Sequence, residues 1–275
     1  PMHDYHLVVG RRPKYAKSQL YTLHQTRFGL VATTFNTAVA LVFWLTGGFE
    51  FADQLVRQMA QHELVRGLLF FSLLGVASSV LSLPFELYGT FVLEAKFGFN
   101  KTTVKTFICD KLKGLLLTVI LGGGVLAATL AFFMYVGELG WLWCWLAMTS
   151  FTLLMTFLAP IYLLPLFNKF TPIDEYQLPD DTQCTFQPKH LKAKVEQYAH
   201  EVQFDFGGIY VIDGSTRSAH SNAFFTGFGK TKRIALFDTL LESSTESEIM
   251  AVLAHEVGHY KKHHIITDMV FDVVH

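Results

Sequence analysis

One short run of residues could bind a metal ion and use it chemically: His255-Glu256-Val257-Gly258-His259. On an α-helix, side chains four residues apart share a face, with Cβ atoms about 5–6 Å apart. The imidazoles of His255 and His259 can therefore both reach one zinc ion at Zn–N distances of about 2.0–2.1 Å. Glu256 lies about 100° round the helix, within reach of a metal-bound water. This pattern predicts a zinc site with Glu256 as general base, the arrangement that peptide hydrolysis needs.

The ligand set of this site is incomplete. A catalytic zinc site normally has three protein ligands and one open position. The extended pattern HExxHxxGxxH fails here, because Lys262 and Ile265 occupy its glycine and third histidine positions. His263 and His264 are the nearest alternatives, and His263 points about 80° away from the first histidine of the run. We expect one Zn²⁺ per chain, with a carboxylate beyond His275 as the third ligand.

Local signals around the site predict a small mixed α+β region. Thr245 and Glu248 form a capping box that begins a helix running past His259. Apolar residues at helical spacing predict an amphipathic helix over residues 190–202. The β-branched and aromatic segments 207–212, 222–225 and 233–237 predict short strands.

The rest of the chain is too apolar for a soluble protein. Hydrophobic residues make up 51% of the 275 residues and charged residues only 16%, against about a quarter charged in soluble domains. Four apolar runs are each long enough to cross a bilayer, at residues 29–49, 67–87, 115–136 and 141–167. Lys and Arg total 22 against 23 Asp and Glu, so there is no basic field to bind nucleic acid.

The positive charges between these runs alternate. The segment before the first run carries 5 Lys and Arg, and the three following loops carry 2, 5 and 0. By the positive-inside rule, the N-terminus and the region after residue 167 face the cytoplasm. We therefore expect a cytoplasmic juxtamembrane segment at 1–28, four transmembrane helices with their loops at 29–167, a cytoplasmic metalloprotease lobe at 168–264, and the start of a further span at 265–275.

Several stretches of the chain resemble the integral-membrane CAAX prenyl protease family of zinc metallopeptidases, the a-factor-converting type. They are 26–29 (TRFG), 91–102 (FVLEAKFGFNKT), 165–170 (PLFNKF), 213–218 (DGSTRS), 220–224 (HSNAF) and 255–259 (HEVGH). Phe224-Phe225 and Lys261-Lys262, in and beside these motifs, resemble the bacterial members of the family. Because the chain opens with Pro1 and stops in an apolar stretch, we expect a member that is incomplete at both ends.

The resemblance implies a mainly α, multispanning helical membrane protein whose small α+β cytoplasmic lobe is a gluzincin-like zinc metalloprotease. It implies that His255 and His259 bind zinc, that Glu256 is the general base, and that a later Glu completes the ligand set. It also implies that the strand of Asn222, Ala223 and Phe224 pairs with the substrate backbone. The family cleaves peptides that end in a prenylated CAAX motif. The expected partners are therefore a prenylated or membrane-anchored peptide or protein and the lipid bilayer. The expected location is a bacterial inner membrane, or the ER or nuclear membrane in a eukaryote, with the active site facing the cytoplasm.

Other functions remain open at this level. The chain could be a membrane transporter or channel in which the histidines carry ions, although its apolar runs hold few of the charges that transport needs. It could also be a catalytically inactive homologue, since a third zinc ligand is missing. Arg217 and His220 could contact substrate or be ordinary polar loop residues. Glu86, Glu94 and Asp110, at the ends of spans, could line a polar cavity or be ordinary interfacial residues.

Overall fold

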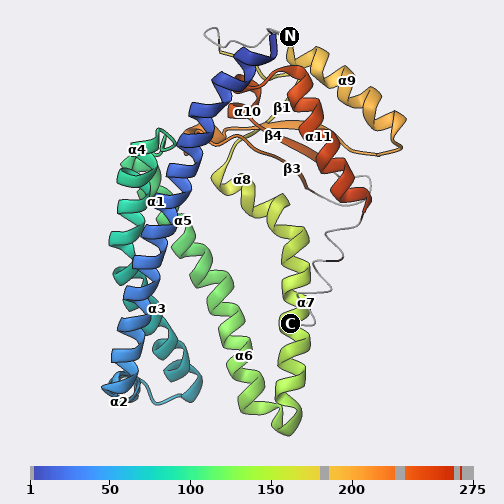
Figure 1. Cartoon of the computed structure of the whole chain (residues 1–275). Helices are drawn as coiled ribbons and strands as arrows, with labels where there is room; N and C mark the ends of the chain where they lie inside the picture. Colours follow the sequence, from blue (N-terminus) through green and yellow to red (C-terminus); the bar gives the residue numbers. More distant parts are fainter. Residues whose placement is uncertain (1–2, 180–185, 227–232, 263–266, 268–275) are drawn as a thin grey trace. The chain divides into compact units, whose positions relative to one another are not determined.

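The computed structural model describes residues 3–179, 186–226, 233–262 and 267. The chain divides into two compact units. The first comprises residues 1–100 and 113–137, and the second comprises residues 101–112 and 138–275. The first unit is helical, and the second contains the lobe with the HEVGH run (Figure 1).

The first unit consists of long helices joined by short connections. Its elements are α1 (His3–Leu45), α2 (Gly48–Met59), α3 (Glu63–Tyr88), η1 (Gly89–Glu94), α4 (Ala95–Phe97), η2 (Thr118–Gly122) and α6 (Gly123–Tyr135). The turns η1 and η2 are π-helical and continue the axes of their neighbours. Gly98 ends this run of helix in the left-handed region at φ 79°, where a residue without Cβ is favoured.

Aromatic side chains and small residues hold the helices of the first unit together. The ring of Phe28 on α1 packs against Phe85 and Tyr88 of α3, at centroid distances of 6.2 and 5.0 Å. At Gly67 of α3, a Cβ would lie only 2.7 Å from a methyl carbon of Leu130 on α6. The missing side chain therefore lets these two helices approach closely, as small residues do between membrane helices.

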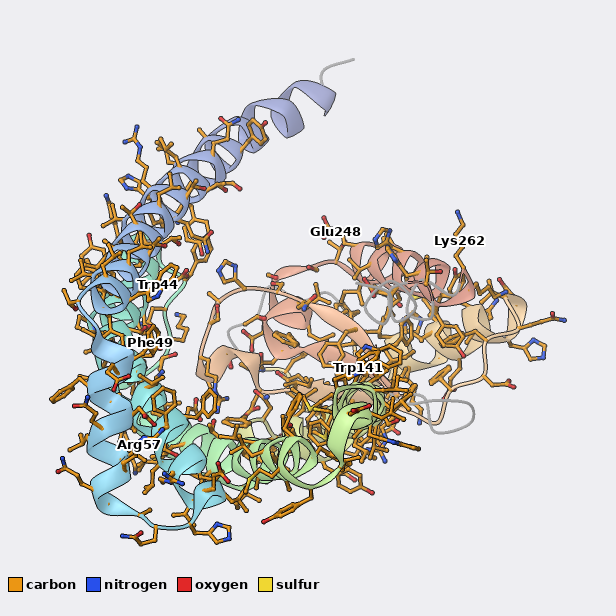
Figure 2. All side chains as sticks on the ribbon, turned by 90° about the horizontal axis from the view of Figure 1, so that it is seen from below. Trp44, Phe49, Arg57, Trp141, Glu248 and Lys262 are labelled. Carbon is orange, nitrogen blue, oxygen red and sulfur yellow. The ribbon has the colours of Figure 1, made fainter. Side chains whose placement is uncertain are left out.

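Four helical stretches among the described residues are long and apolar enough to cross a membrane: Tyr15–Leu45, Glu63–Phe97, Val104–Tyr135 and Gly137–Phe167. No residue in the most apolar part of any of them is buried, so their side chains need an apolar solvent. Trp44 near the end of the first stretch and Trp141 near the start of the fourth are both well exposed (Figure 2). Each stretch begins 4 to 14 residues before the apolar run seen in the sequence, because the helix continues beyond the strictly apolar residues.

The second unit combines the end of the apolar region with the mixed lobe. Its helical elements are α5 (Val104–Leu117, of which residues 104–112 belong to this unit), η3 (Gly137–Leu139), α7 (Gly140–Leu158), η4 (Ala159–Leu163), α8 (Leu164–Phe167), α9 (Pro188–Glu201), η5 (Gly214–Thr216), α10 (Asp238–Ser243) and α11 (Glu246–Lys261). The strands are β1 (Phe170–Pro172), β2 (Ile209–Ile212), β3 (Ala223–Thr226) and β4 (Arg233–Phe237).

The four strands form one sheet in the order β1-β2-β4-β3. Strands β2 and β4 are parallel, while β1 pairs antiparallel with β2 and β3 pairs antiparallel with β4. The strands expected near 207–212, 222–225 and 233–237 are confirmed as β2, β3 and β4, and the helix expected over 190–202 is confirmed as α9. The sequence did not predict β1, because a strand of three residues is too short to show an alternation of apolar and polar side chains.

The core of the lobe lies between the sheet and its helices. Buried residues of β2 and β4 pack against Leu191 of α9, Leu241 of α10, and Ile249 and Leu253 of α11, each at most 1% exposed. A mainly helical chain with long apolar helices and a small α+β lobe was the expected fold class, and it is confirmed. The start of a further span expected at 265–275 lies outside the described residues apart from Thr267.

Candidate active site

Helix α11 carries the HEVGH run and begins at the predicted capping box. The Thr245 hydroxyl accepts a hydrogen bond from the Glu248 amide at 3.4 Å, and the Glu248 carboxylate accepts from the Thr245 amide at 2.8 Å. These bonds satisfy amide groups that the first turn of a helix leaves unpaired. The capping box is confirmed, and Figure 2 labels Glu248 near the start of the helix and Lys262 just after its end.

The two sides of α11 have different roles. Ile249, Leu253 and Val257 recur every four residues and are 0%, 1% and 4% exposed. His255 and His259 each lie two residues from Val257, about 200° round the helix, and both are exposed. Burial of one side therefore fixes the helix in rotation and leaves the two imidazoles facing outward.

The two imidazoles are close enough to share one metal ion. Their Nε2 atoms lie 3.0 Å apart and their ring centroids 4.5 Å apart. Two nitrogens bound to one tetrahedral zinc at about 2.05 Å would be about 3.3 Å apart. The pair would need to open by only a few tenths of an ångström, so His255 and His259 fit two positions of a zinc site. Glu256, half-buried, lies between them in the sequence.

The third zinc ligand is not found in the part of the chain that the structure describes. Within that part, no group of three or more His, Cys, Asp or Glu side chains is arranged to hold a metal ion. His263 and His264, the alternatives considered from the sequence, lie outside the described residues. The expectation of a carboxylate beyond His275 stays a prediction.

The residues Asn222, Ala223 and Phe224 lie at the start of the sheet's edge strand, β3. The Asn222 carbonyl accepts a hydrogen bond from the Phe237 amide at 3.0 Å, so Asn222 directs this group toward β4. Because pairing alternates along an antiparallel ladder, Ala223 and Phe225 direct their main-chain groups away from β4. The Asn222 side chain accepts from the Ala223 amide at 2.9 Å, which leaves the Ala223 carbonyl and the Phe225 amide and carbonyl directed to the outer edge.

An aromatic cluster joins this edge strand to α11, the helix that carries the HEVGH run. Phe204 is 4% exposed and contacts Phe225 of β3 edge-to-face at a centroid distance of 5.0 Å. It also contacts Tyr260 of α11 in the same way at 5.2 Å, and Val257 is buried in the same cluster. The strand and the helix are therefore packed as one body. This link was not visible in the sequence, since nothing local marks three aromatic residues so far apart as neighbours.

The sequence left the role of Arg217 open, and the structure assigns it a partner. The guanidinium of Arg217 binds the carboxylate of Asp110 through two nitrogens, at 2.7 and 3.0 Å. This bond, opposed in part by burial, holds the pKa of Arg217 above its ordinary value. Asp110 thus pairs with an arginine from the lobe. The sequence showed these as two separate polar residues, and nothing in it indicated that they pair.

A buried carboxylate orders the loop that leads to the edge strand. Asp238 is 6% exposed and accepts hydrogen bonds from the Ser215 amide at 2.8 Å, the Ser215 hydroxyl at 2.5 Å and the Thr239 amide at 2.8 Å. One turn along α10, burial raises the pKa of Glu242, the charge of Asp238 adds to this shift, and Lys101 opposes it. The turn of residues 213–215, which precedes β3, is therefore fixed by hydrogen bonds from Ser215 to the Asp238 carboxylate.

Comparison with known families decides the assignment. The family described as CAAX prenyl protease N-terminal, five membrane helices, matches residues 10–169, and the family described as Peptidase family M48 matches residues 186–275. The chain belongs to the CAAX prenyl protease family. It is accordingly a multi-pass integral membrane protein.

Individual members of the CAAX prenyl protease family agree with this assignment. CAAX prenyl protease 1 of Saccharomyces cerevisiae is 37% identical over 271 residues, covering 94% of this chain and 57% of that protein. The CAAX prenyl protease 1 homolog of Oryza sativa subsp. japonica is 36% identical over 265 residues, covering 94% of this chain and 59% of that protein. The crystal structure of S. mikatae Ste24p matches with a TM-score of 0.83 and 36% identity, covering 94% of this chain and 58% of that chain.

The relatives are longer than this chain, and they come from eukaryotes. The chain spans less than two thirds of the length of the CAAX prenyl proteases it matches. The similar proteins of Arabidopsis thaliana, Mus musculus and Homo sapiens are eukaryotic as well. The expectation of a bacterial-type member therefore gains no support from them.

Proposed function

We propose that the protein is a membrane-embedded zinc metalloendopeptidase that hydrolyses peptide bonds of C-terminally prenylated, CAAX-type or otherwise membrane-anchored peptides. The observation that carries this proposal is the pair of exposed imidazole nitrogens, 3.0 Å apart on α11. Glu256 lies between them in the sequence of a chain that belongs to the CAAX prenyl protease family. The segment 168–264 would form the protease lobe, and the four long apolar helices would hold it at the bilayer.

Three residues of the run have roles in this proposal. His255 and His259 would hold one Zn²⁺, and a carboxylate from the rest of the protein would complete the ligand set. When bound, zinc lowers the pKa of a water molecule and polarises the peptide carbonyl. Glu256 accepts a proton from the attacking water and returns it to the leaving amine, as the carbon–nitrogen bond breaks and the water oxygen stays on the carbonyl carbon.

The edge strand β3 would hold the substrate in an extended conformation. An extended peptide can pair with a free strand edge through main-chain hydrogen bonds, whatever its side chains. The outward-facing main-chain groups at Ala223 and Phe225 supply donors and acceptors for such pairing. Asn222, Ala223 and Phe224 are therefore proposed as substrate-binding residues. The contact of β3 with α11 through Phe225 would then keep the bound peptide in register with Glu256.

We infer the location of the site from the positive residues around the apolar runs and from the organisms of the relatives. The alternation of positive residues around the apolar runs supports a cytoplasmic N-terminus and a lobe on the cytoplasmic side. A lipid-anchored substrate would reach such a site while its anchor stays in the bilayer. Because the relatives described above are eukaryotic, we favour the ER or nuclear membrane over a bacterial inner membrane.

The proposal is tested with two variants of the full-length protein in lipid nanodiscs. Glu256→Gln should abolish cleavage of a farnesylated CAAX peptide while the zinc content per chain, measured by elemental analysis, stays unchanged. His255→Ala should abolish cleavage and also lower the zinc content. Cleavage that survives Glu256→Gln would contradict the peptidase mechanism. A wild-type protein that holds zinc yet cleaves no peptide would indicate an inactive homologue or a metal transporter instead.

A further inference from the structure

Arg217 connects the lobe to the ends of the apolar helices through a network of short hydrogen bonds. Its Nε and Nη2 donate to the two carboxylate oxygens of Asp110, at 2.7 and 3.0 Å. Nη1 donates to Asn168 Oδ1 at 3.2 Å, and Nη2 also donates to the Phe167 carbonyl at 2.6 Å. A fork-shaped pair of this kind fixes direction as well as distance, because both carboxylate oxygens are engaged at once.

The partners of the Arg217 side chain lie at the ends of two candidate membrane spans. Asp110 is on α5, within the first turns of the span Val104–Tyr135. Phe167 is the last residue of the span Gly137–Phe167. The side chains of Arg217 and Asp110 are only 26% and 23% exposed. One arginine therefore holds two helix ends together in a partly desolvated position.

The main chain on either side of Arg217 is attached in the same region. Its carbonyl accepts hydrogen bonds from the Lys101 amide and the Thr102 hydroxyl, both at 3.0 Å, just before α5 begins. Four residues earlier, Asp213 accepts a bond from the Lys169 amide at 2.7 Å, just after α8 ends. The loop is thus bonded to the span ends through the Arg217 side chain and through the main chain on either side of it.

The other end of this loop is fixed to the sheet. The Thr239 hydroxyl on α10 donates to the His220 carbonyl at 2.9 Å, and the Phe237 amide on β4 donates to the Asn222 carbonyl at 3.0 Å. Strand β3 begins at the next residue, and it packs on α11 through the cluster around Phe204. A displacement of the loop at Arg217 would therefore move the sheet and α11 as one body relative to the span ends.

We propose that Arg217 is a positioning residue that holds β3 and α11 at a fixed distance from the two span ends, and that this distance selects which peptide bond of a membrane-anchored substrate reaches Glu256. The inference rests on the proposed peptidase function. An extended peptide advances about 3.3 Å per residue. A shift of the lobe by that amount, with the substrate's anchor held in the bilayer, moves the cleavage point by one residue.

The test measures where substrates are cut rather than how fast. The full-length protein in phosphatidylcholine nanodiscs is given peptides of one sequence, joined to a farnesyl anchor by spacers that lengthen one residue at a time. Mass spectrometry gives the ratio of products cut at neighbouring bonds. In the wild type we expect the main cleavage position to depend sharply on spacer length. In Arg217→Ala the ratio of the main product to the product cut at the neighbouring bond should be about tenfold lower, which corresponds to about 1.4 kcal/mol. Arg217→Lys keeps the charge but lacks the fork, and should lie in between.

Controls separate positioning from stability. Arg57 and Asp53 form another arginine–aspartate pair on the exposed side of α2, with Arg57 Nε 2.6 Å from Asp53 Oδ2 (Figure 2). Arg57→Ala removes this pair and should leave the product ratio unchanged. Asp110→Ala should reproduce Arg217→Ala, and the double variant should add nothing further. A peptide without the anchor should give the same products with every variant, because it can slide with the strand.

The outcomes distinguish this inference from the function on which it rests. An unchanged product ratio in Arg217→Ala and Arg217→Lys would overturn the inference, even if both variants were slower, because slower cutting at the same bond indicates only a less stable fold. If Glu256→Gln abolishes all cleavage while that ratio is unchanged, the peptidase function stands and the inference fails. If cleavage survives Glu256→Gln, it is the proposed function that fails.

Discussion

The packing of α11 should make the proposed metal site sensitive to a buried residue that is not one of its proposed ligands. Leu253 is 1% exposed and lies in the lobe core between Ile249 and Val257, one turn to either side. It is two residues before His255, so its side chain points away from the imidazoles. We predict that Leu253→Ala loosens α11 and weakens metal binding although both histidines remain.

The size of this effect depends on burial. Replacing a fully buried leucine by alanine costs about 2–5 kcal/mol, because the lost methyl groups leave a cavity that closes only in part. For a side chain that is 1% exposed and surrounded by other buried residues, about 3 kcal/mol is a reasonable central value. If the substitution lowers the free energy of local opening of α11 by this amount, the backbone amides of the helix should exchange about a hundredfold faster.

Hydrogen–deuterium exchange with mass spectrometry on the full-length protein would measure this change over residues 249–259. Lys261→Ala, an exposed substitution on the same helix, is the matched control and should change exchange less than about threefold. Zinc content after dialysis should fall in Leu253→Ala and not in the control. If α11 in Leu253→Ala exchanged at the wild-type rate while zinc was lost, the reasoning that burial holds the imidazoles in place would be refuted.

Three shorter predictions concern the same lobe. Thr245→Ala removes the helix cap shared with Glu248 and should lower the free energy of unfolding by about 1 kcal/mol, which thermal unfolding of the lobe would show. Glu242 has a raised pKa because of burial and the nearby charge of Asp238, so the folded state binds its proton more tightly than the unfolded state. Stability should therefore decrease as pH rises above the ordinary value of 4.5, and unfolding curves of Glu242→Gln should lack this decrease. His259→Ala should weaken metal affinity by at least about a hundredfold, as competition with a chelator would measure.

The sequence predicted the features that depend on neighbouring residues. The capping box at Thr245, the helix that begins there and the positions of β2, β3 and β4 were all visible as local patterns and are confirmed. The long apolar runs were visible for the same reason, although each candidate span starts earlier than expected. The roles of His255, Glu256 and His259 stay predictions, because the structure gives only their geometry.

The sequence could not show which distant residues meet. Asp110 and Arg217 are 107 positions apart, and both were interpreted as separate polar residues. Phe204, Phe225 and Tyr260 come from three different parts of the lobe and carry no common local pattern. The sequence also did not predict the amphipathic helix α2, in which Ala52 and Val56 are buried. Its residues were interpreted as a loop because they lie between two much stronger apolar runs.

By itself the sequence determined the chemistry that the chain can offer, because two imidazoles four residues apart lie on one face of any helix. It also determined that much of the chain needs an apolar solvent, because long runs without charge cannot stay exposed to water. Tertiary structure alone decided that these imidazoles face outward, that β3 is an edge strand, and that Arg217 reaches the ends of two apolar helices. These features depend on contacts between residues far apart in the chain, which form only when the whole lobe packs.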